Sequence, residues 1–215
     1  LETGTSDAVV NYASGSGSVD LIFNYTVAST HVSDDLDYKA TNSLTLNSGS
    51  INDAAGNAAT LTLASPGAAN SLSANKALVV DGVVATVSSV TSTVSDDTYK
   101  LSDVIPVTIT FSEAVTVTGT PQLTLETGSS DAVVNYSSGS GSNTLTFNYT
   151  IATGHATSDL DYTATNSLAL NSGTIKDGAG NTSVLTLASP GATNSLGANK
   201  ALVVDGVVAT VSSVS

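Results

Sequence analysis

Residues 75–90 read NKALVVDGVVATVSSV, and the same sixteen letters return unchanged at residues 199–214. The two stretches are 124 residues apart, and residues 1–91 align on residues 125–215 at that spacing without a gap. Of the 91 aligned pairs, 69 are identical and 22 differ. Near-identical tandem copies are typical of array proteins, in which each unit contacts mainly its neighbours. The repeat therefore favours a spacer or adhesive module over an enzyme, which needs only one site.

The period also predicts the domain boundaries, because a unit of 124 residues has the size of an ordinary domain. We expect residues 1–84 to form a repeat that lacks its N-terminal third, and residues 85–208 to form a complete repeat. Residues 209–215 match residues 85–91 at all but the last position, so they are expected to begin a third repeat. The chain is expected to be a window from a longer array.

Composition excludes several classes of partner. The formal net charge is −13, from 18 acidic residues and only five basic ones. Nucleic acids and anionic membrane surfaces need clustered Lys or Arg, so neither is expected to bind. No apolar run approaches the length of a membrane span, and we predict no membrane insertion. Acidic repeats have two ordinary explanations, which are solubility and the binding of divalent cations. There is no Cys, so neither disulfides nor thiolate metal sites contribute.

Short segments rich in Thr, Val, Leu and Tyr alternate with Gly-, Ser- and Asn-rich turns along the complete repeat. The predicted strands are residues 104–111, 122–126, 132–136, 144–151, 160–165, 184–187 and 201–204. No segment shows helical periodicity over ten residues. This pattern predicts an all-β fold, in which each repeat is an antiparallel β-sandwich of two sheets. The junction between repeats has no Pro- or Ser-rich linker, which favours an extended, semi-rigid rod.

The residues also carry a family resemblance. The segments TITFSEAVTVTG, SDLDYTATNSLALNSGTIKDGAGN and ANKALVVDG resemble the bacterial Ig-like tandem repeats of giant secreted surface adhesins and biofilm-associated proteins. The resemblance extends over the complete copy and both partial ones. It implies an Ig-like β-sandwich, secretion to the cell surface, and a role as a stalk or adhesive array. Many arrays of this kind are rigidified by calcium between their units.

Acidic residues are the candidate ligands for such a cation. If the strands alternate in direction, five carboxylates are predicted to meet where two repeats join, namely Asp35, Asp37, Asp81, Glu113 and Asp177. Carboxylates at that density repel one another unless a cation joins them, and calcium accepts six to eight oxygen ligands in tolerant geometry. Four further candidates are predicted at the far end of the complete repeat, namely Asp96, Asp159, Asp161 and Asp205.

Each candidate also has an explanation without a metal. Asp53 is a further candidate ligand and the counterpart of Asp177, and both stand in D-x-x-G-N stretches that suit an ordinary turn. Asp159 and Asp161 alternate on an extended segment, which suits shared coordination and equally a charged sheet edge. The cofactor prediction is therefore calcium, with the turn and edge explanations still open.

Four functions are weighed against these observations. A non-catalytic structural or adhesive repeat of an extracellular bacterial protein is the first, with neighbouring repeats as partners and an unknown surface ligand. The second is a carbohydrate- or protein-binding module, which the absence of Trp disfavours. The third is a fibre subunit, in which a tail such as Ala209–Ser215 adds a strand to an identical chain. The fourth is an enzyme, for which the sequence offers no nucleophile–base pair or His cluster; we predict that it is not an enzyme.

Overall fold

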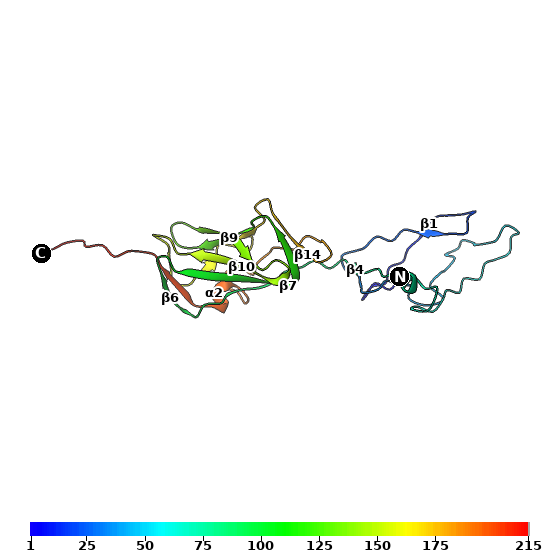
Figure 1. Ribbon diagram of the computed structural model, residues 1–215, viewed down its shortest axis with the longest axis horizontal. Helices are drawn as coiled ribbons and strands as arrows, with labels where there is room; N and C mark the ends of the chain where they lie inside the picture. Colours follow the sequence, from blue (N-terminus) through cyan, green and yellow to red (C-terminus); the bar gives the residue numbers. More distant parts are fainter. Residues whose placement is uncertain (215) are drawn as a thin grey trace. The chain divides into compact units, whose positions relative to one another are not determined.

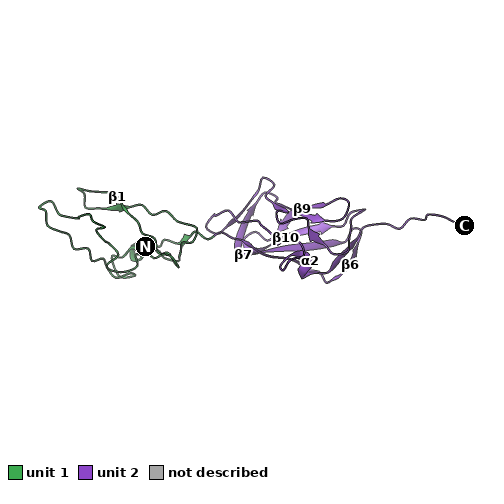
Figure 2. Ribbon diagram, turned by 180° about the vertical axis from the view of Figure 1, so that it is seen from behind, with its two compact units in different colours: residues 1–83 green, residues 84–215 purple. Residues whose placement is uncertain are grey.

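The computed structural model describes residues 1–214, which form two compact units. Unit 1 comprises residues 1–83, and unit 2 begins at Val84, one residue before the predicted boundary (Figure 2). Residue 215, the last of the predicted third repeat, lies outside the described residues. The fold is all-β, as the sequence predicts, with only two short helices among the described residues. Neither helix is long or apolar enough to cross a membrane.

Unit 2 holds most of the strands. They are β5 (Val87–Ser92), β6 (Asp97–Lys100), β7 (Val104–Thr118), β8 (Gln122–Glu126), β9 (Ala132–Ser138), β10 (Ser142–Thr150), β11 (Ala156–Thr157), β12 (Asp161–Tyr162), β13 (Leu168–Ala169), β14 (Thr174–Asp177) and β15 (Leu202–Asp205). The largest sheet has the order β12-β8-β9-β10-β7-β14, with β13 also paired to β8 and β5 also paired to β7. All pairs in it are antiparallel.

Strand β7 organises this sheet, and it runs through the middle of unit 2 in Figure 1. Its first half pairs with β10 on one side and with β5 on the other. The β10 register shifts between Ser142 and Thr144, and beyond this irregularity β7 pairs with β14, where Val115 lies opposite Asp177. A bulge bends a strand and increases its twist. The bend lets one strand of fifteen residues join three neighbours.

The core of unit 2 follows from the period-two pattern of its strands. In β10, Leu145, Phe147 and Tyr149 are buried and alternate with polar residues, as side chains on one face of a strand must. Strands β7 and β8 contribute alternating buried residues in the same way. The β7 members are Ile105, Val107, Ile109, Phe111 and Val115. Burial of large apolar side chains from several strands is the main stabilising contribution to this unit.

A smaller sheet of unit 2 has the order β11-β15-β6. Strand β15 pairs in parallel with β6, so that Leu202 lies opposite Asp97, more than one hundred residues earlier in the chain. Just before β15 lies the four-residue helix α2 (Leu196–Asn199), whose N-cap Ser195 accepts a hydrogen bond from the Ala198 N–H at 3.1 Å. Strand β6 and strand β14 lie toward opposite ends of the unit (Figure 1).

Unit 1 contains short strands and one helix, namely β1 (Tyr12–Ser14), β2 (Ile22–Phe23), β3 (Val32–Ser33), β4 (Val80–Asp81) and α1 (Leu72–Asn75). Positions 124 residues apart in the two units make matching contacts, but their burial differs. Phe23 is 40% exposed whereas Phe147 is fully buried. Phe147 lies in β10 opposite Val107 of β7, whereas the strands of residues 1–83 are β1 to β4 and include no equivalent of β7.

Comparison with the observed strands shows which strands the local sequence pattern predicts correctly. The prediction for 122–126 is confirmed to the residue, and those for 104–111, 132–136 and 144–151 are confirmed with longer or shifted ends. The strand predicted at 184–187 is wrong, because Val184 makes only an isolated bridge to Thr86. Strand β14 lies inside a stretch that looks like a turn in the sequence, since NSGTIKDGAGN has few apolar residues.

Candidate metal centre

The structure brings together two of the predicted ligands, Glu113 and Asp177. Asp177 is the last residue of β14 and is paired with Val115 of β7, two residues beyond Glu113. One carboxylate oxygen of each residue lies within 4.8 Å of the other. Asp177 is 3% exposed and Glu113 is half-buried. The pairing of β14 with β7 therefore holds two acids side by side at one end of unit 2.

The two oxygens of the Asp177 carboxylate have different surroundings. Oδ1 accepts hydrogen bonds from the N–H groups of Ala179 at 3.0 Å and Asn181 at 2.8 Å, which close the predicted turn. Oδ2 is buried and has no hydrogen-bond partner in the part of the chain that the structure describes. A buried carboxylate oxygen without a partner is costly, because the charge has lost its hydration. Turn chemistry thus explains one oxygen of Asp177 and leaves the other available to a cation.

Asp53, 124 residues earlier, makes the same turn in unit 1 and has no such spare oxygen. Its Oδ1 accepts bonds from the N–H groups of Ala55 at 2.9 Å and Asn57 at 2.8 Å. Its Oδ2 accepts a bond from the Asn57 side-chain amide at 2.8 Å. These hydrogen bonds, led by the one from the Asn57 side chain, lower the pKa of Asp53. Asp53 is exposed, and its contacts are those of a turn residue.

The start of unit 2 lies beside Glu113. The Thr86 N–H donates to Ser112 Oγ at 3.0 Å, and the Ser112 N–H donates to the Thr86 carbonyl at 2.8 Å. The predicted ligand Asp81 ends β4 in unit 1 and lies five residues before Thr86 in the chain. Its Oδ1 accepts a bond from the Val83 N–H at 3.0 Å. Covalent connection thus limits the distance between Asp81 and Thr86 to roughly 17 Å even for a fully extended chain.

The far end of unit 2 carries the other predicted group. Burial, followed by the charges of Asp161 and Asp96, raises the pKa of Asp159. Lys200 Nζ lies 3.9 Å from Asp96 Oδ1 and partly offsets this charge. Asp161 accepts bonds from the N–H groups of Tyr162 at 2.9 Å and Gly191 at 2.9 Å, and Asp205 accepts one from Val207. No three of these four acids have ligand atoms close enough to share an ion within residues 1–214.

Asp35 and Asp37 were predicted to lie beside Asp81, but the pairing of β3 with β4 leads them away from it. Val32 lies opposite Asp81, and the Leu36 N–H donates to the Leu78 carbonyl at 2.8 Å. Asp37 is therefore about four residues, or roughly 13 Å, along the strands from Asp81. Asp35 is exposed.

The buried Asp37 carboxylate acts as a hydrogen-bond acceptor for the segment around α1. It accepts bonds from Ser73 Oγ at 2.7 Å and from the N–H groups of Gly67 at 3.0 Å, Tyr38 at 2.8 Å and Leu72 at 3.3 Å. Burial of the carboxyl acts to raise its pKa, but the hydrogen bonds from Ser73, Gly67 and Tyr38 outweigh burial and lower the pKa to about 2. These bonds to the charged form account for its ionisation without a metal.

The hydrogen bonds to the Asp37 carboxylate predict how the unfolding free energy of unit 1 depends on pH. Because the folded-state pKa of Asp37 is depressed from 3.8 to about 2, its stabilising contribution is complete above about pH 4 and is lost toward pH 2. Replacing Asp37 by Asn should lower the unfolding free energy by roughly 1–3 kcal/mol at pH 7. The difference from the parent chain should vanish near pH 2. Denaturant titrations followed by circular dichroism at several pH values measure both effects.

Ser73 provides the matched control for Asp37. Gly197 stands at the position in unit 2 that corresponds to Ser73. A Ser73→Gly variant therefore removes the hydrogen bond that Ser73 Oγ donates to Asp37, and the second copy already carries this residue. The Asp37 carboxyl, followed by carbon-detected NMR, should then titrate at a higher pH. An Asp37 that titrates at or above 3.8 in the parent chain would contradict the assignment.

Sequence reasoning missed one polar pair. His155 Nδ1 lies 2.9 Å from the Tyr149 hydroxyl, and His31 Nδ1 lies 2.8 Å from the Tyr25 hydroxyl. Both histidines are half-buried beside a tyrosine. The Tyr-to-His spacing of six in both copies is the signal that could have found them.

Comparisons of the chain with protein-family models, curated proteins and solved structures found no match.

Proposed function

We propose that the chain is a non-catalytic structural and adhesive repeat of an extracellular bacterial surface protein, in which calcium stiffens the junctions of a stalk. The observation that carries the proposal is Asp177, whose carboxylate lies near that of Glu113 and whose buried Oδ2 has no hydrogen-bond partner within residues 1–214. A hard dication satisfies such an oxygen directly, and carboxylates are the ligands that calcium prefers.

The proposed ligands are Glu113 and Asp177, which lie together in unit 2, and Asp81, which the sequence predicts at the same junction. Asp81 belongs to the last strand of unit 1, whereas the other two belong to unit 2. A cation held by all three would join the end of one repeat to the start of the next. Calcium needs six to eight oxygens, so water and backbone carbonyls would complete its coordination. Joining the units in this way restricts bending at the junction, which is the property a stalk requires.

The wider proposal also rests on the sequence. Each complete repeat is proposed to be an Ig-like β-sandwich, supported by the antiparallel sheet around β7, the smaller sheet around β15 and the apolar core of unit 2. The tandem near-identity of the copies supports an array rather than a single catalytic domain. The resemblance to adhesin repeats supports a cell-surface location, with an unknown surface ligand bound elsewhere.

Calcium titration calorimetry of the 215-residue chain, after exhaustive chelation, tests the proposal. We expect saturable heat with one ion bound per chain, because the chain carries one complete set of Asp81, Glu113 and Asp177. X-ray scattering should then give a larger or more sharply defined maximum dimension in calcium than in chelator. Absence of heat would reject the cation and leave a passive acidic spacer. Heat without a change in scattering would reject stiffening but keep binding.

A further inference from the structure

The hairpin that follows β14 carries a second unpaired oxygen. Among the residues that the structure describes, only two buried side-chain nitrogen or oxygen atoms lack a hydrogen-bond partner, and they are Asp177 Oδ2 and Ser183 Oγ. Asp177 is 3% exposed and Ser183 is 6% exposed. A hydroxyl that is buried without a partner is destabilising, because it has lost its bonds to water. One ligand placed between the two oxygens would satisfy both.

The backbone of the hairpin places both oxygens on its buried face. The Asp177 N–H donates to the Asn181 carbonyl at 3.1 Å, and the Ser183 N–H donates to the Ile175 carbonyl at 3.0 Å. In this register Ser183 lies diagonally across from Asp177, with both side chains on the same face. Thr182, the residue before Ser183, points to the opposite face and is exposed.

The spacing of these side chains suits a single ion. Diagonal neighbours in an antiparallel pair have Cβ atoms roughly 7 Å apart. Calcium binds each oxygen at about 2.3–2.6 Å, so oxygens on opposite sides of the ion lie about 5 Å apart. The Glu113 carboxylate supplies a further oxygen within 4.8 Å of Asp177. A calcium ion held between Asp177 and Glu113 is therefore within reach of the Ser183 hydroxyl.

Unit 1 differs at each of these atoms. Ala59 stands at the position that corresponds to Ser183, so unit 1 has no hydroxyl there. Asp53 corresponds to Asp177, and its Oδ2 accepts a bond from the Asn57 side-chain amide at 2.8 Å. The two unpaired oxygens thus occur together in unit 2, and neither occurs in the matching turn of unit 1.

We propose that Ser183 Oγ is a ligand of the calcium ion held by Asp177 and Glu113, and that Ser or Ala at this position sets how tightly a copy binds the ion. A hydroxyl can coordinate a cation through a lone pair and donate its proton to a coordinated water. The inference rests on the proposed calcium site and adds to it. All three ligands belong to unit 2, so this unit binds the ion without a contribution from Asp81.

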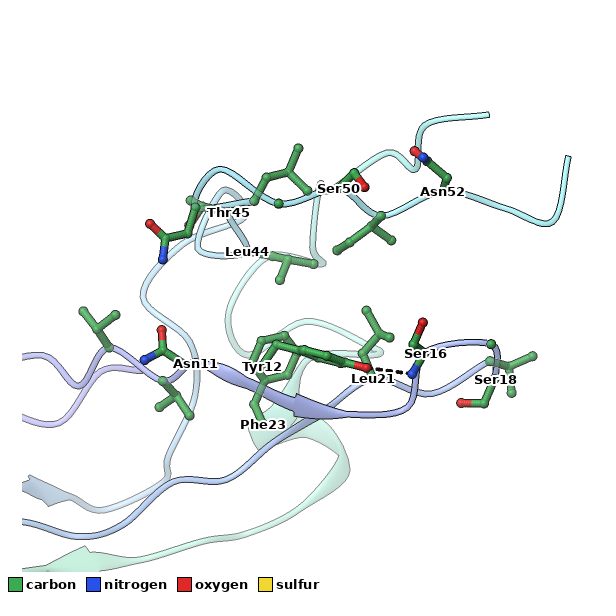
Figure 3. Close-up of a pocket in the computed structure, with 18 residues that line it drawn as sticks. Asn11, Tyr12, Ser16, Ser18, Leu21, Phe23, Leu44, Thr45, Ser50 and Asn52 are labelled. Carbon is green, nitrogen blue, oxygen red and sulfur yellow. Dashed lines mark hydrogen bonds between the residues drawn. The ribbon is translucent and has the colours of Figure 1, made fainter. Parts of the chain in front are cut away.

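The apolar cleft of unit 1 is not expected to hold a second ion. Figure 3 shows Tyr12 and Phe23 on one side of the cleft and Leu44 on the other. The Tyr12 hydroxyl accepts a bond from the Ser16 N–H at 2.7 Å. None of the described residues that line the cleft is acidic. Calcium prefers carboxylate oxygens, so its binding should be confined to the site in unit 2.

Calcium titration calorimetry of the full chain and two variants tests the role of Ser183. Ser183→Ala should raise the dissociation constant roughly tenfold, because one ligand is replaced by a methyl group. Thr182→Ala is the matched control, since it removes the neighbouring hydroxyl from the exposed face and should leave the dissociation constant unchanged. Each substitution introduces the residue that unit 1 carries at the same position, Ala59 or Ala58, so neither is expected to disturb the hairpin.

Melting curves in chelator and in calcium separate a ligand from a structural hydroxyl. In chelator Ser183→Ala should melt above the parent chain, because no unpaired buried hydroxyl remains. Addition of calcium should then raise its melting temperature by less than it raises that of the parent. If a bound water instead joined Ser183 to Asp177, the variant would melt below the parent in chelator and respond fully to calcium, which would overturn the inference.

The titration also separates this inference from the proposed function. A parent chain that binds calcium with the same dissociation constant as Ser183→Ala would overturn the role of Ser183 and leave the site at Asp177 and Glu113. A parent chain that gives no heat would overturn both. Weaker binding by Ser183→Ala, with no effect of calcium on the X-ray scattering, would support the ligand and reject the stiffening of the junction.

Discussion

Replacing Phe147 by Ala should cost unit 2 about 3–5 kcal/mol of unfolding free energy, the range for truncating a fully buried aromatic side chain. Phe147 lies in β10 opposite Val107 of β7 and has no exposed surface. Its ring also meets Tyr136 edge-on, with ring centroids 6.1 Å apart. The cost arises because the surrounding strands cannot collapse fully into the space that the ring leaves.

The same substitution at Phe23 is the matched control. Phe23 meets Tyr12 with the same 6.1 Å centroid separation and the same 74° interplanar angle, so the aromatic contact is identical in the two units. Phe23 is 40% exposed, whereas Phe147 has no exposed surface. Phe23→Ala should therefore cost only about 1 kcal/mol, since less apolar surface is involved.

Differential scanning calorimetry of both variants measures the contrast. A loss of 3–5 kcal/mol should lower the melting temperature of unit 2 by roughly 10 °C or more, whereas Phe23→Ala should move a transition by a few degrees. Equal losses at the two positions would show that Phe23 is covered in solution.

Replacing Asp177 by Asn should abolish the stabilisation of unit 2 by calcium. At a calcium concentration one hundred times the dissociation constant, a single site stabilises the folded state by about 2.7 kcal/mol. Asn keeps an oxygen that can accept the turn bonds from Ala179 and Asn181, so the turn is preserved. It removes the charge of the buried Oδ2, which is the atom available to the cation. In chelator the variant should be at least as stable as the parent, because the unpaired charge is gone.

Asp53→Asn is the control for the turn. Asp53 occupies the matching position in unit 1, and its carboxylate accepts turn hydrogen bonds from Ala55 and Asn57. This variant should keep the full response to calcium. Melting curves of the parent and both variants, each in calcium and in chelator, give the comparison. A calcium response that survives in Asp177→Asn would show that the ion binds elsewhere.

Local pattern accounts for much of unit 2. Alternation of Leu and Thr predicts β8 to the residue, and the same pattern in β10 predicts that Leu145 and Phe147 share a buried face. The D-x-x-G-N pattern predicts the turn at Asp177, since the Asp177 side chain accepts hydrogen bonds from backbone N–H groups only two to four residues away. Features of this kind depend on neighbours in the chain, so the sequence is sufficient to predict them.

Other features depended on residues that are far apart in the chain. No local sequence pattern predicts the parallel pairing of β6 with β15, or the irregularity in β7 beyond which it pairs with β14. The pair Glu113–Asp177 follows from that second pairing, because it sets which acids lie at one end of the sheet. The prediction that Asp37 lies beside Asp81 is wrong because it also depended on a strand pairing that local sequence does not predict. The register of β3 on β4 separates them along the strands.

The sequence by itself determined the tandem repeat, the all-β class, the acidic character and the positions of the turns, since each is a matter of spacing and composition. Only the tertiary structure decided which copy of a residue is buried. Phe23 and Phe147 have nearly the same local sequence and the same aromatic contact, and Asp53 and Asp177 accept the same turn bonds at Oδ1. They differ because burial depends on which strands cover a residue, and β7 covers only unit 2.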